Sequence, residues 1–403
     1  MKNTRQLFKR SRLALPLLLA FSAAACAENT QNAVQTASAA SQNSVASTVR
    51  AAVQANPQDA AQRWQWQTVA QGLNHPWGLA FLPDGGFLVT ERSGNLRVVN
   101  ADGKISEPVS GLPEIDAGGQ GGLLDVALDT DFAQTRRVYF CFSEPGRSGN
   151  STALAEGILS ADSRSLGNVK TLFSQQPKVA SRNHFGCRIV LTPEHIYLSM
   201  GDRYSRRDDA QNLGNHIGKI VRLKRDGSVP ADNPFAKQNG ARAEIWSYGN
   251  RNVQGLALDT QGRLWANEHG AQGGDEINLI GPGNNYGWPV ISYGTDYGGG
   301  KIGEGTAKAG MQQPVYYWDP SIAPSGMTFV GENPYGSDWR GNLLAGSLKF
   351  GYVARLTLDG ERVLREEKIE VGERVRDVRQ SPDGAVYILT DSSNGKLMKL
   401  LPQ

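Results

Sequence analysis

The stretch Ile245–Pro289 reads IWSYGNRNVQGLALDTQGRLWANEHGAQGGDEINLIGPGNNYGWP. Two runs with strand-like alternation, Val253–Leu258 and Arg263–Asn267, flank the turn Asp259–Gly262, and this pattern predicts a β-hairpin. Polar, glycine-rich clusters with charges of both signs precede and follow the hairpin. Loops carried on a sheet are where binding and catalytic residues concentrate, so we expect a functional site here, with long solvated turns as the alternative.

The hairpin pattern occurs six times along the chain. Each copy has an apolar strand, a turn that usually contains Asp or Gly, and a second strand. The copies lie at Gly78–Thr90, Leu124–Phe142, Arg188–Asp202, Gly255–Asn267, Gly326–Gly346 and Asp377–Thr390. Such a repeat predicts an all-β fold, a six-bladed β-propeller of four-stranded antiparallel blades, in which the strand Arg63–Val69 completes the last blade. A two-domain β-sandwich is the alternative, but it would not explain six copies.

The N-terminal segment has the composition of an export signal. Five basic residues precede Leu13, an apolar run continues to Ala25, and small residues surround Cys26. This predicts a signal peptide over residues 1–25, followed either by a lipidated Cys26 or by an ordinary cleavage site, and hence a periplasmic or outer-membrane-anchored protein. Residues 26–61 are rich in Ala, Gln, Ser and Asn, which predicts a disordered tether before a propeller over residues 62–403.

The charge and the cysteines limit the possible partners. Without the five N-terminal basic residues, the formal charge of +3 falls to −2, which does not favour binding to nucleic acid. Cys141 and Cys187 could pair in an oxidising compartment, but the sequence leaves their pairing open.

Polar and cationic residues stand next to the inner strands of different copies. Because loops and inner strands of a propeller surround a common axis, we expect these side chains to converge. Several cations in one cleft require an anion, and a flat polycarboxylate would suit because Arg binds carboxylate through two parallel hydrogen bonds. Each cation taken alone would also fit a solvated loop. The candidates are Gln120, Arg251, Asn252, Lys349, Arg374 and Arg376.

Two further groups carry possible chemistry. His184 is a candidate general base, since a histidine near its ordinary pKa can accept a proton from a hydroxyl at neutral pH; a hydrogen-bonded structural histidine is the alternative. The loop after the hairpin offers backbone carbonyls at Gly270 and Ala271, and carboxylates at Glu276 and Asp296. Oxygen ligands of this kind suit Ca²⁺.

Several motifs resemble those of the quinoprotein sugar dehydrogenases, the family of soluble glucose dehydrogenase and aldose sugar dehydrogenase. The most specific are GQGGLLDVAL, NHFGCRIV, YGNRNVQGLAL, EHGAQGGDEINLI, NNYGWP, DPSIAPSGM, SLKFG and RVRDV. The resemblance runs from about Trp66 to Leu400. It implies a six-bladed propeller with two cofactors, Ca²⁺ and pyrroloquinoline quinone (PQQ), a flat tricarboxylate ortho-quinone.

The resemblance also implies roles for individual residues. His184 would be the base, and Gly270 and Ala271 would offer carbonyls to a catalytic Ca²⁺. A second calcium site would include Glu276, Tyr286 and Asp296. The quinone would be held by Gln120, Arg251, Asn252, Lys349, Arg374 and Arg376.

The implied activity is oxidation of the anomeric hydroxyl of an aldose to a lactone, with hydride transfer to the quinone and later electron transfer to an external acceptor. Asn183 and Ala271 differ from the glucose dehydrogenase subgroup, whereas Ser321 and Tyr316–Asp319 favour the aldose dehydrogenase subgroup. A calcium-dependent propeller lactonase and a non-catalytic propeller that binds sugar or protein are the alternatives. A lactonase, however, would not need four cations around an organic anion.

Overall fold

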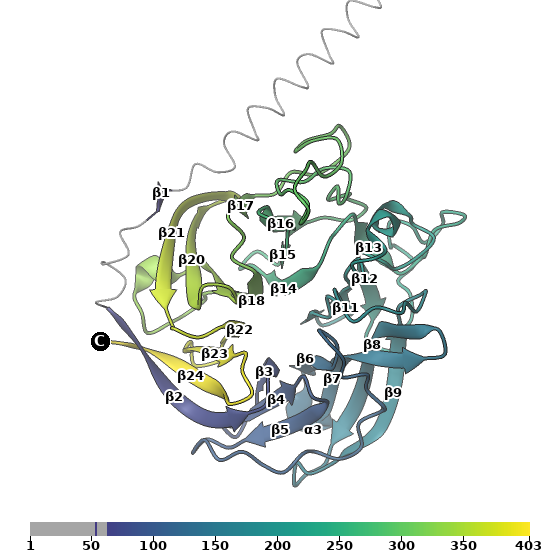
Figure 1. The fold of residues 1–403 in the computed structure, drawn as a ribbon. Helices are drawn as coiled ribbons and strands as arrows, with labels where there is room; N and C mark the ends of the chain where they lie inside the picture. Colours follow the sequence, from purple (N-terminus) through teal and green to yellow (C-terminus); the bar gives the residue numbers. More distant parts are fainter. Residues whose placement is uncertain (1–52, 55–62) are drawn as a thin grey trace, which may run out of the picture. The chain divides into compact units, whose positions relative to one another are not determined.

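The computed structural model describes residues 53–54 and 63–403. Six β-sheets form a ring around a central axis (Figure 1), so the predicted six-bladed propeller is confirmed. The predicted signal peptide lies outside the described residues, as does the predicted tether apart from Val53 and Gln54. Among the described residues, no helix has the length and apolar character needed to cross a membrane.

Each blade begins with an inner strand next to the axis. The inner strands are β3 (Pro76–Phe81), β6 (Leu123–Leu128), β10 (Ile189–Leu191), β14 (Val253–Leu258), β18 (Pro324–Phe329) and β22 (Val375–Gln380). The second strands are β4 (Phe87–Glu91), β7 (Arg137–Gly146), β11 (His195–Ser199), β15 (Leu264–Glu268), β19 (Leu343–Ser347) and β23 (Val386–Thr390). All six predicted hairpins are therefore the inner pairs of the six blades.

The outer strands complete the blades. The third strands are β5 (Asn95–Val99), β8 (Gly149–Leu159), β12 (Lys219–Lys224), β16 (Asp275–Ile280), β20 (Tyr352–Asp359) and β24 (Gly395–Pro402). The fourth strands are β9 (Leu166–Ser174), β13 (Ile245–Tyr248), β17 (Tyr316–Trp318), β21 (Arg362–Glu370) and β2 (Trp64–Leu73). As predicted, the N-terminal strand β2 pairs with β24 and closes the ring, from Trp64 opposite Pro402 to Leu73 opposite Gly395.

Two blades differ from the predicted four strands. The first blade has three strands, because the chain after β5 continues as a loop that returns only through an isolated bridge between Val99 and Ile105. The fifth blade gains β1 (Val53–Gln54), which pairs in parallel with β21. The antiparallel four-stranded pattern holds in the other blades.

The packing explains why these short strands are stable. Apolar side chains fill the spaces between adjacent blades, and Trp265 of β15 packs with Met327 and Leu343 of the next blade. The turn of the opening hairpin needs a glycine: Gly262 has φ +76°, and its amide donates to the Asp259 carbonyl at 3.0 Å.

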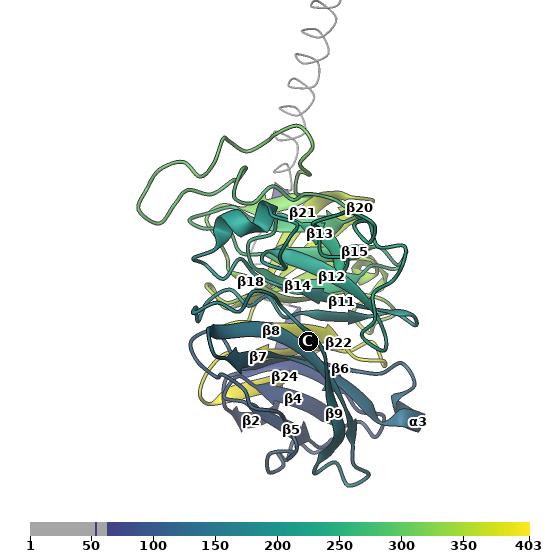
Figure 2. The same ribbon diagram turned by 90° about the vertical axis from the view of Figure 1, so that its right-hand side faces the viewer.

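Two long loops connect strands within the third and fourth blades. The segment of residues 200–218 links β11 to β12 and contains the 3₁₀ helix η1 (Arg207–Gln211). The loop of residues 281–315, green in Figure 2, links β16 to β17 and projects from the ring of blades. The other helices of the described residues are α3 (Phe132–Thr135) and η2 (Ser337–Trp339).

Candidate active site

A cavity of about 420 Å³ lies at the propeller axis, since residues of all six blades line it. Five of the six predicted quinone ligands meet there: Gln120, Asn252, Lys349, Arg374 and Arg376. The lining also includes residues that the sequence analysis did not select, namely Trp77, Arg92, Gln254 and His269.

The two arginines of β22 and its preceding loop share one carboxylate. Arg376 is buried, and its guanidinium donates to Gln254 Oε1 at 3.1 Å and to Asp391 Oδ2 at 3.0 Å. Arg374 is more exposed and donates to the same Asp391 oxygen at 3.3 Å and to the Leu348 carbonyl at 2.9 Å. Burial lowers the pKa of Arg376, although Asp391 opposes this shift.

The donors of this axial cavity suit an anionic ligand. Arg376 Nε is buried and has no hydrogen-bond partner among the described residues. Asn252 Oδ1 accepts from the Gly186 amide at 3.2 Å, and Gln120 Oε1 accepts from the His184 amide at 2.8 Å. The NH₂ groups of both amide side chains are therefore left as donors beside the cations. A flat polycarboxylate fits this set of groups.

His184 is held by a buried carboxylate next to the axial cavity. Its Nδ1 lies 2.6 Å from Asp202 Oδ1, and Trp288 Nε1 donates to Asp202 Oδ2 at 2.8 Å. A carboxylate at Nδ1 places the ring proton there, so Nε2 is the atom able to accept a proton. Burial lowers the pKa of His184, with Asp202 opposing, which favours the neutral ring.

His184 does not itself line the axial cavity, but the following residues Phe185 and Gly186 do, and the His184 amide donates to Gln120 of the cavity wall. Its backbone has a positive φ of 51°. Gly201 packs against it so closely that a Cβ would lie 2.2 Å from the His184 carbonyl oxygen, which restricts that position to glycine. A disulfide between Cys141 and Cys187, left open by the sequence, fixes the same segment to β7.

Arg251 lines a cleft of about 250 Å³ together with Asp202, the partner of His184. Its guanidinium donates to the His269 carbonyl at 3.2 Å and to the Tyr297 hydroxyl at 3.3 Å. The ring of Trp288 lies 5.2 Å away. Arg251 Nε is another buried nitrogen without a partner in the described part of the chain.

The candidate metal ligands fall into two neighbouring groups. Gly270, Glu276 and Tyr286 line one small cavity with Glu268, whereas Ala271 and Asp296 line the cleft that contains Asp202; Arg251 lines both. Asp296 accepts from Arg207 Nη1 at 3.0 Å. Among the described residues, no group of three or more His, Cys, Asp and Glu side chains is arranged to hold a metal.

The small cavity nevertheless contains two adjacent carboxylates. Glu268 of β15 stands directly opposite Glu276 of β16. Burial and the neighbouring Glu268 raise the pKa of Glu276 to about 8. Burial raises the pKa of Glu268 to about 7. Two buried carboxylates with carbonyls beside them are a donor set that suits a hard cation.

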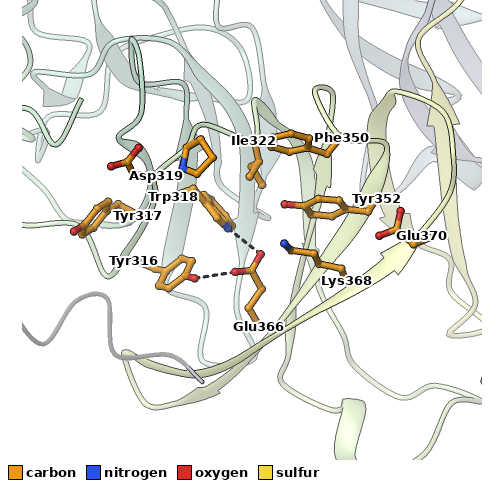
Figure 3. A pocket seen from close by; sticks show the side chains of 11 residues that line it. Tyr316, Tyr317, Trp318, Asp319, Ile322, Phe350, Tyr352, Glu366, Lys368 and Glu370 are labelled. Atoms are coloured by element: carbon orange, nitrogen blue, oxygen red, sulfur yellow. Dashed lines mark hydrogen bonds between the residues drawn. The ribbon is translucent and has the colours of Figure 1, made fainter. Parts of the chain in front are cut away.

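A separate pocket of about 300 Å³ lies between the fourth and fifth blades (Figure 3). In it the Tyr316 hydroxyl and Trp318 Nε1 donate to Glu366 at 2.8 and 3.0 Å. No residue that the sequence analysis assigned to cofactor, metal or catalysis lines this pocket.

Residues 73–399 match the family model described as glucose/sorbosone dehydrogenase. Aldose sugar dehydrogenase YliI of Escherichia coli strain K12 is 46% identical over 339 residues, which cover 82% of this chain and 91% of that protein. The chain belongs to the glucose/sorbosone dehydrogenase family. Quinoprotein glucose dehydrogenase B of Acinetobacter calcoaceticus is 29% identical over 411 residues, or 81% of this chain and 85% of that one.

Solved structures of the glucose/sorbosone dehydrogenase family share the whole propeller. The apo form of the soluble aldose sugar dehydrogenase from Escherichia coli has a TM-score of 0.82 at 44% identity, covering 84% of this chain and 100% of that one. The PQQ-bound form of aldose sugar dehydrogenase from Streptomyces coelicolor has a TM-score of 0.70 at 29% identity, covering 85% and 99%. The family resemblance inferred from the motifs is confirmed.

The site residues that sequence reasoning missed had weak signals. Gln254 and His269 belong to the stretch Ile245–Pro289, but no pattern of the six hairpin copies singles them out. Asp202 ends the third copy of the hairpin pattern, where its carboxylate could have been paired with His184. Trp77 lies in β3 and Arg92 directly follows β4, and only the ring topology brings both to the axis.

Proposed function

We propose that this protein is a PQQ- and Ca²⁺-dependent aldose sugar dehydrogenase, which oxidises the anomeric hydroxyl of an aldose to a lactone. The observation that carries the proposal is the axial cavity, in which cations from separate blades converge beside the His184–Asp202 pair. The names of the relatives support it, since one is a quinoprotein and one solved structure is PQQ-bound.

The residues of the axial cavity would hold the cofactor by its carboxylates. Lys349, Arg374 and Arg376 offer positive charge, and the side-chain amides of Gln120 and Asn252 offer neutral donors. PQQ, when bound, supplies the carbonyl that accepts the hydride. The donors that line the cavity would fix the orientation of the bound cofactor before the chemical step.

His184 would act as the general base. Its Nε2 would accept the proton of the anomeric hydroxyl, while Asp202 holds the ring orientation and stabilises the imidazolium that forms. Arg251 would stabilise negative charge that develops during the reaction, because its guanidinium is preorganised by the His269 carbonyl and by Trp288. Arg251 also shares a cleft with Asp202, the partner of His184, which supports a role beside the base.

Calcium would be held by the loop that follows the hairpin. Gly270 and Ala271 would offer backbone carbonyls to one ion, and Glu276 with Tyr286 would contribute to a second ion. Bound Ca²⁺ would supply Lewis-acid stabilisation of negative charge. The adjacent buried carboxylates Glu268 and Glu276 support this assignment, because a cation relieves their repulsion.

We also propose that the protein is exported, with Cys26 as a possible point of lipid attachment and an external electron acceptor outside the cytoplasm. The sequence of residues 1–26 supports export. The disulfide between Cys141 and Cys187 supports an oxidising compartment.

The test is reconstitution of the apo-protein with PQQ and Ca²⁺, followed by dye reduction with a panel of aldoses. We expect activity that depends on PQQ, and we expect His184→Ala to lower kcat by about 10²- to 10⁴-fold while PQQ still binds. His195→Ala, at the start of β11, is the control histidine and should leave kcat unchanged. Dye reduction that proceeds equally without PQQ would overturn the proposal.

A further inference from the structure

Arg92 is a fourth cation of the axial cavity, and its backbone is fixed from two sides. It follows the last residue of β4, and its amide donates to the His75 carbonyl at 3.0 Å. Gly122 lies so close that a Cβ there would be 1.9 Å from the Arg92 carbonyl oxygen. The main chain is therefore held in place at the cavity, which Arg92 lines.

The wall contains more positive charge than the protein neutralises. Its charged lining residues are Arg92, Lys349, Arg374 and Arg376, and no Asp or Glu lines it. His269 is no anion either, and its Nε2 is already engaged by the Pro324 carbonyl at 2.8 Å.

Asp391 is the one carboxylate within ion-pair distance of these cations among the described residues. It contacts Arg374 at 3.3 Å and Arg376 at 3.0 Å, and its other oxygen lies 2.9 Å from His75 Nδ1. In the described part of the chain, Arg92 and Lys349 have no ion pair.

The carboxylate next to Arg92 in the sequence does not neutralise it. Glu91 accepts from Arg97 Nε at 3.0 Å, from Asn95 Nδ2 at 3.0 Å and from the Asn74 amide at 2.7 Å. Both of its oxygens are therefore occupied by groups other than Arg92. Four cations against Asp391 leave three positive charges facing the cavity.

We infer that Arg92 is a further anchor for the cofactor, binding one of its carboxylates. The inference rests on the proposed function, in which PQQ is the cofactor. Its argument is that the number of excess positive charges in the cavity, three, equals the number of carboxylates of PQQ. Without Arg92 the wall would be one charge short of that match. A guanidinium also supplies the paired N–H groups that a carboxylate prefers.

The same excess charge has a cost in the protein without ligand. Like charges in a partly buried wall repel one another, and Arg92 contributes to the lowered pKa of Arg376. Removing Arg92 should therefore weaken cofactor binding without destabilising the apo-protein. A residue that only supports the fold would give the opposite result.

The experiment is an equilibrium titration of PQQ into apo-protein, followed by the absorbance of PQQ. We expect Arg92→Gln to raise the Kd for PQQ by about 10- to 100-fold, as for loss of a hydrogen bond between charged groups. Arg92→Lys keeps the charge but loses the paired N–H groups of the guanidinium. Its Kd for PQQ should lie between those of the wild type and Arg92→Gln. Arg164→Gln, an exposed arginine with the same charge change, is the matched control and should leave the Kd unchanged.

Two further measurements make the result specific. The melting temperature of apo Arg92→Gln should equal or exceed that of the wild type, which excludes misfolding as the reason for weaker binding. The trimethyl ester of PQQ, which carries no carboxylate charge, should lose less affinity than PQQ on the Arg92→Gln change, since the two modifications remove the same contact.

The outcomes separate this inference from the proposed function. If the wild type binds PQQ and Arg92→Gln binds it within about twofold of the wild type, Arg92 is not an anchor and the proposed function stands. If the wild type does not bind PQQ, the proposed function and this inference both fall. Equal loss of affinity for PQQ and its ester on the Arg92→Gln change would also overturn the role of Arg92 in carboxylate binding.

Discussion

Two clusters of arginines lie next to each other on the propeller axis, and they differ in how their charge is balanced. Behind Trp77, Arg188 is completely buried and lies 3.2 Å from Asp125 and 3.0 Å from Asp377. Arg379 pairs with the same two aspartates at 2.7 and 3.0 Å. This balanced cluster has two positive and two negative charges, whereas the axial cavity has three positive charges in excess.

The two clusters differ in whether carboxylates of the protein neutralise the arginines. A structural arginine is neutralised in this way, whereas an arginine that binds an anionic ligand is not. In the balanced cluster, burial opposes the charge of Arg379, but Asp125 and Asp377 raise its pKa above the ordinary value. In the cavity, burial lowers the pKa of Arg376 and Asp391 only partly compensates. An arginine kept buried without full compensation is a candidate for binding an anion.

The largest expected effect comes from breaking the balanced cluster. Asp125→Asn leaves Arg188 and Arg379 with one carboxylate between them, inside the ring of inner strands. We expect the free energy of unfolding to fall by about 3–5 kcal/mol, the range measured when one partner of a buried ion pair is removed. Urea denaturation measures it, with the exposed Asp162→Asn as the control. A loss no larger than that of the control would show that this cluster contributes little to the fold.

The sequence predicts the blades better than it predicts this difference in charge. Hairpin copies, the closure by the N-terminal strand and five of the six predicted quinone ligands of the cavity followed from local pattern and from the ring topology. Arg188 and Arg251 stand in equally specific motifs, NHFGCRIV and YGNRNVQGLAL, yet only Arg188 is neutralised by two aspartates. Its partners lie in other blades, so no local pattern reveals them.

Two other features were also set by distant parts of the chain. The three-stranded first blade reflects where the chain leaves β5 rather than any weak strand pattern. Arg92 has no motif of its own, and its importance depends on the absence of a nearby free carboxylate. Such an absence can be recognised only when all six blades are assembled.

The next effect is that of filling the cavity. PQQ should stabilise the folded protein by about 2.7 kcal/mol when its concentration is 100 times the Kd, if it does not bind the unfolded chain. The physical reason is that its carboxylates neutralise the excess positive charge. Thermal denaturation with and without PQQ measures this change.

Added salt should raise the Kd, because the charges lie in an accessible cavity, and an affinity independent of salt would contradict the charge-matching model.

A smaller effect is expected from removing the charge of Asp202, which raises the pKa of the neighbouring His184. Asp202 raises the pKa of His184 against the lowering effect of burial. Asp202→Asn should therefore lower the pKa of His184 further and move the acidic limb of the pH–rate profile to lower pH. The plateau of kcat should fall roughly tenfold or more, because the ring loses its orientation and the imidazolium its counter-charge.

The profile of kcat against pH in the PQQ-loaded enzyme measures both effects of Asp202→Asn. Asp162→Asn, on the surface, should leave limb and plateau in place. An acidic limb that stays where it is, or moves to higher pH, would contradict the assignment of His184 as the base that Asp202 supports.

The smallest effect is expected at the exposed ion pair between Arg207 and Asp296, whose side chains are 47% and 44% exposed. Solvent screens such a pair, so Asp296→Asn should leave the melting temperature within about 1 °C of the wild type.

Added Ca²⁺ should still stabilise this variant, because Asp296 lines the cleft rather than the cavity that contains Glu276. Glu276→Gln, in contrast, should lose much of the stabilisation by Ca²⁺. Melting curves with Ca²⁺ and with a chelator measure both variants. Asp296→Asn could instead lose the stabilisation by Ca²⁺ as fully as Glu276→Gln. That result would show that Asp296 leaves Arg207 to bind the ion. The exposed fraction of a carboxylate would then not indicate whether it binds a cation.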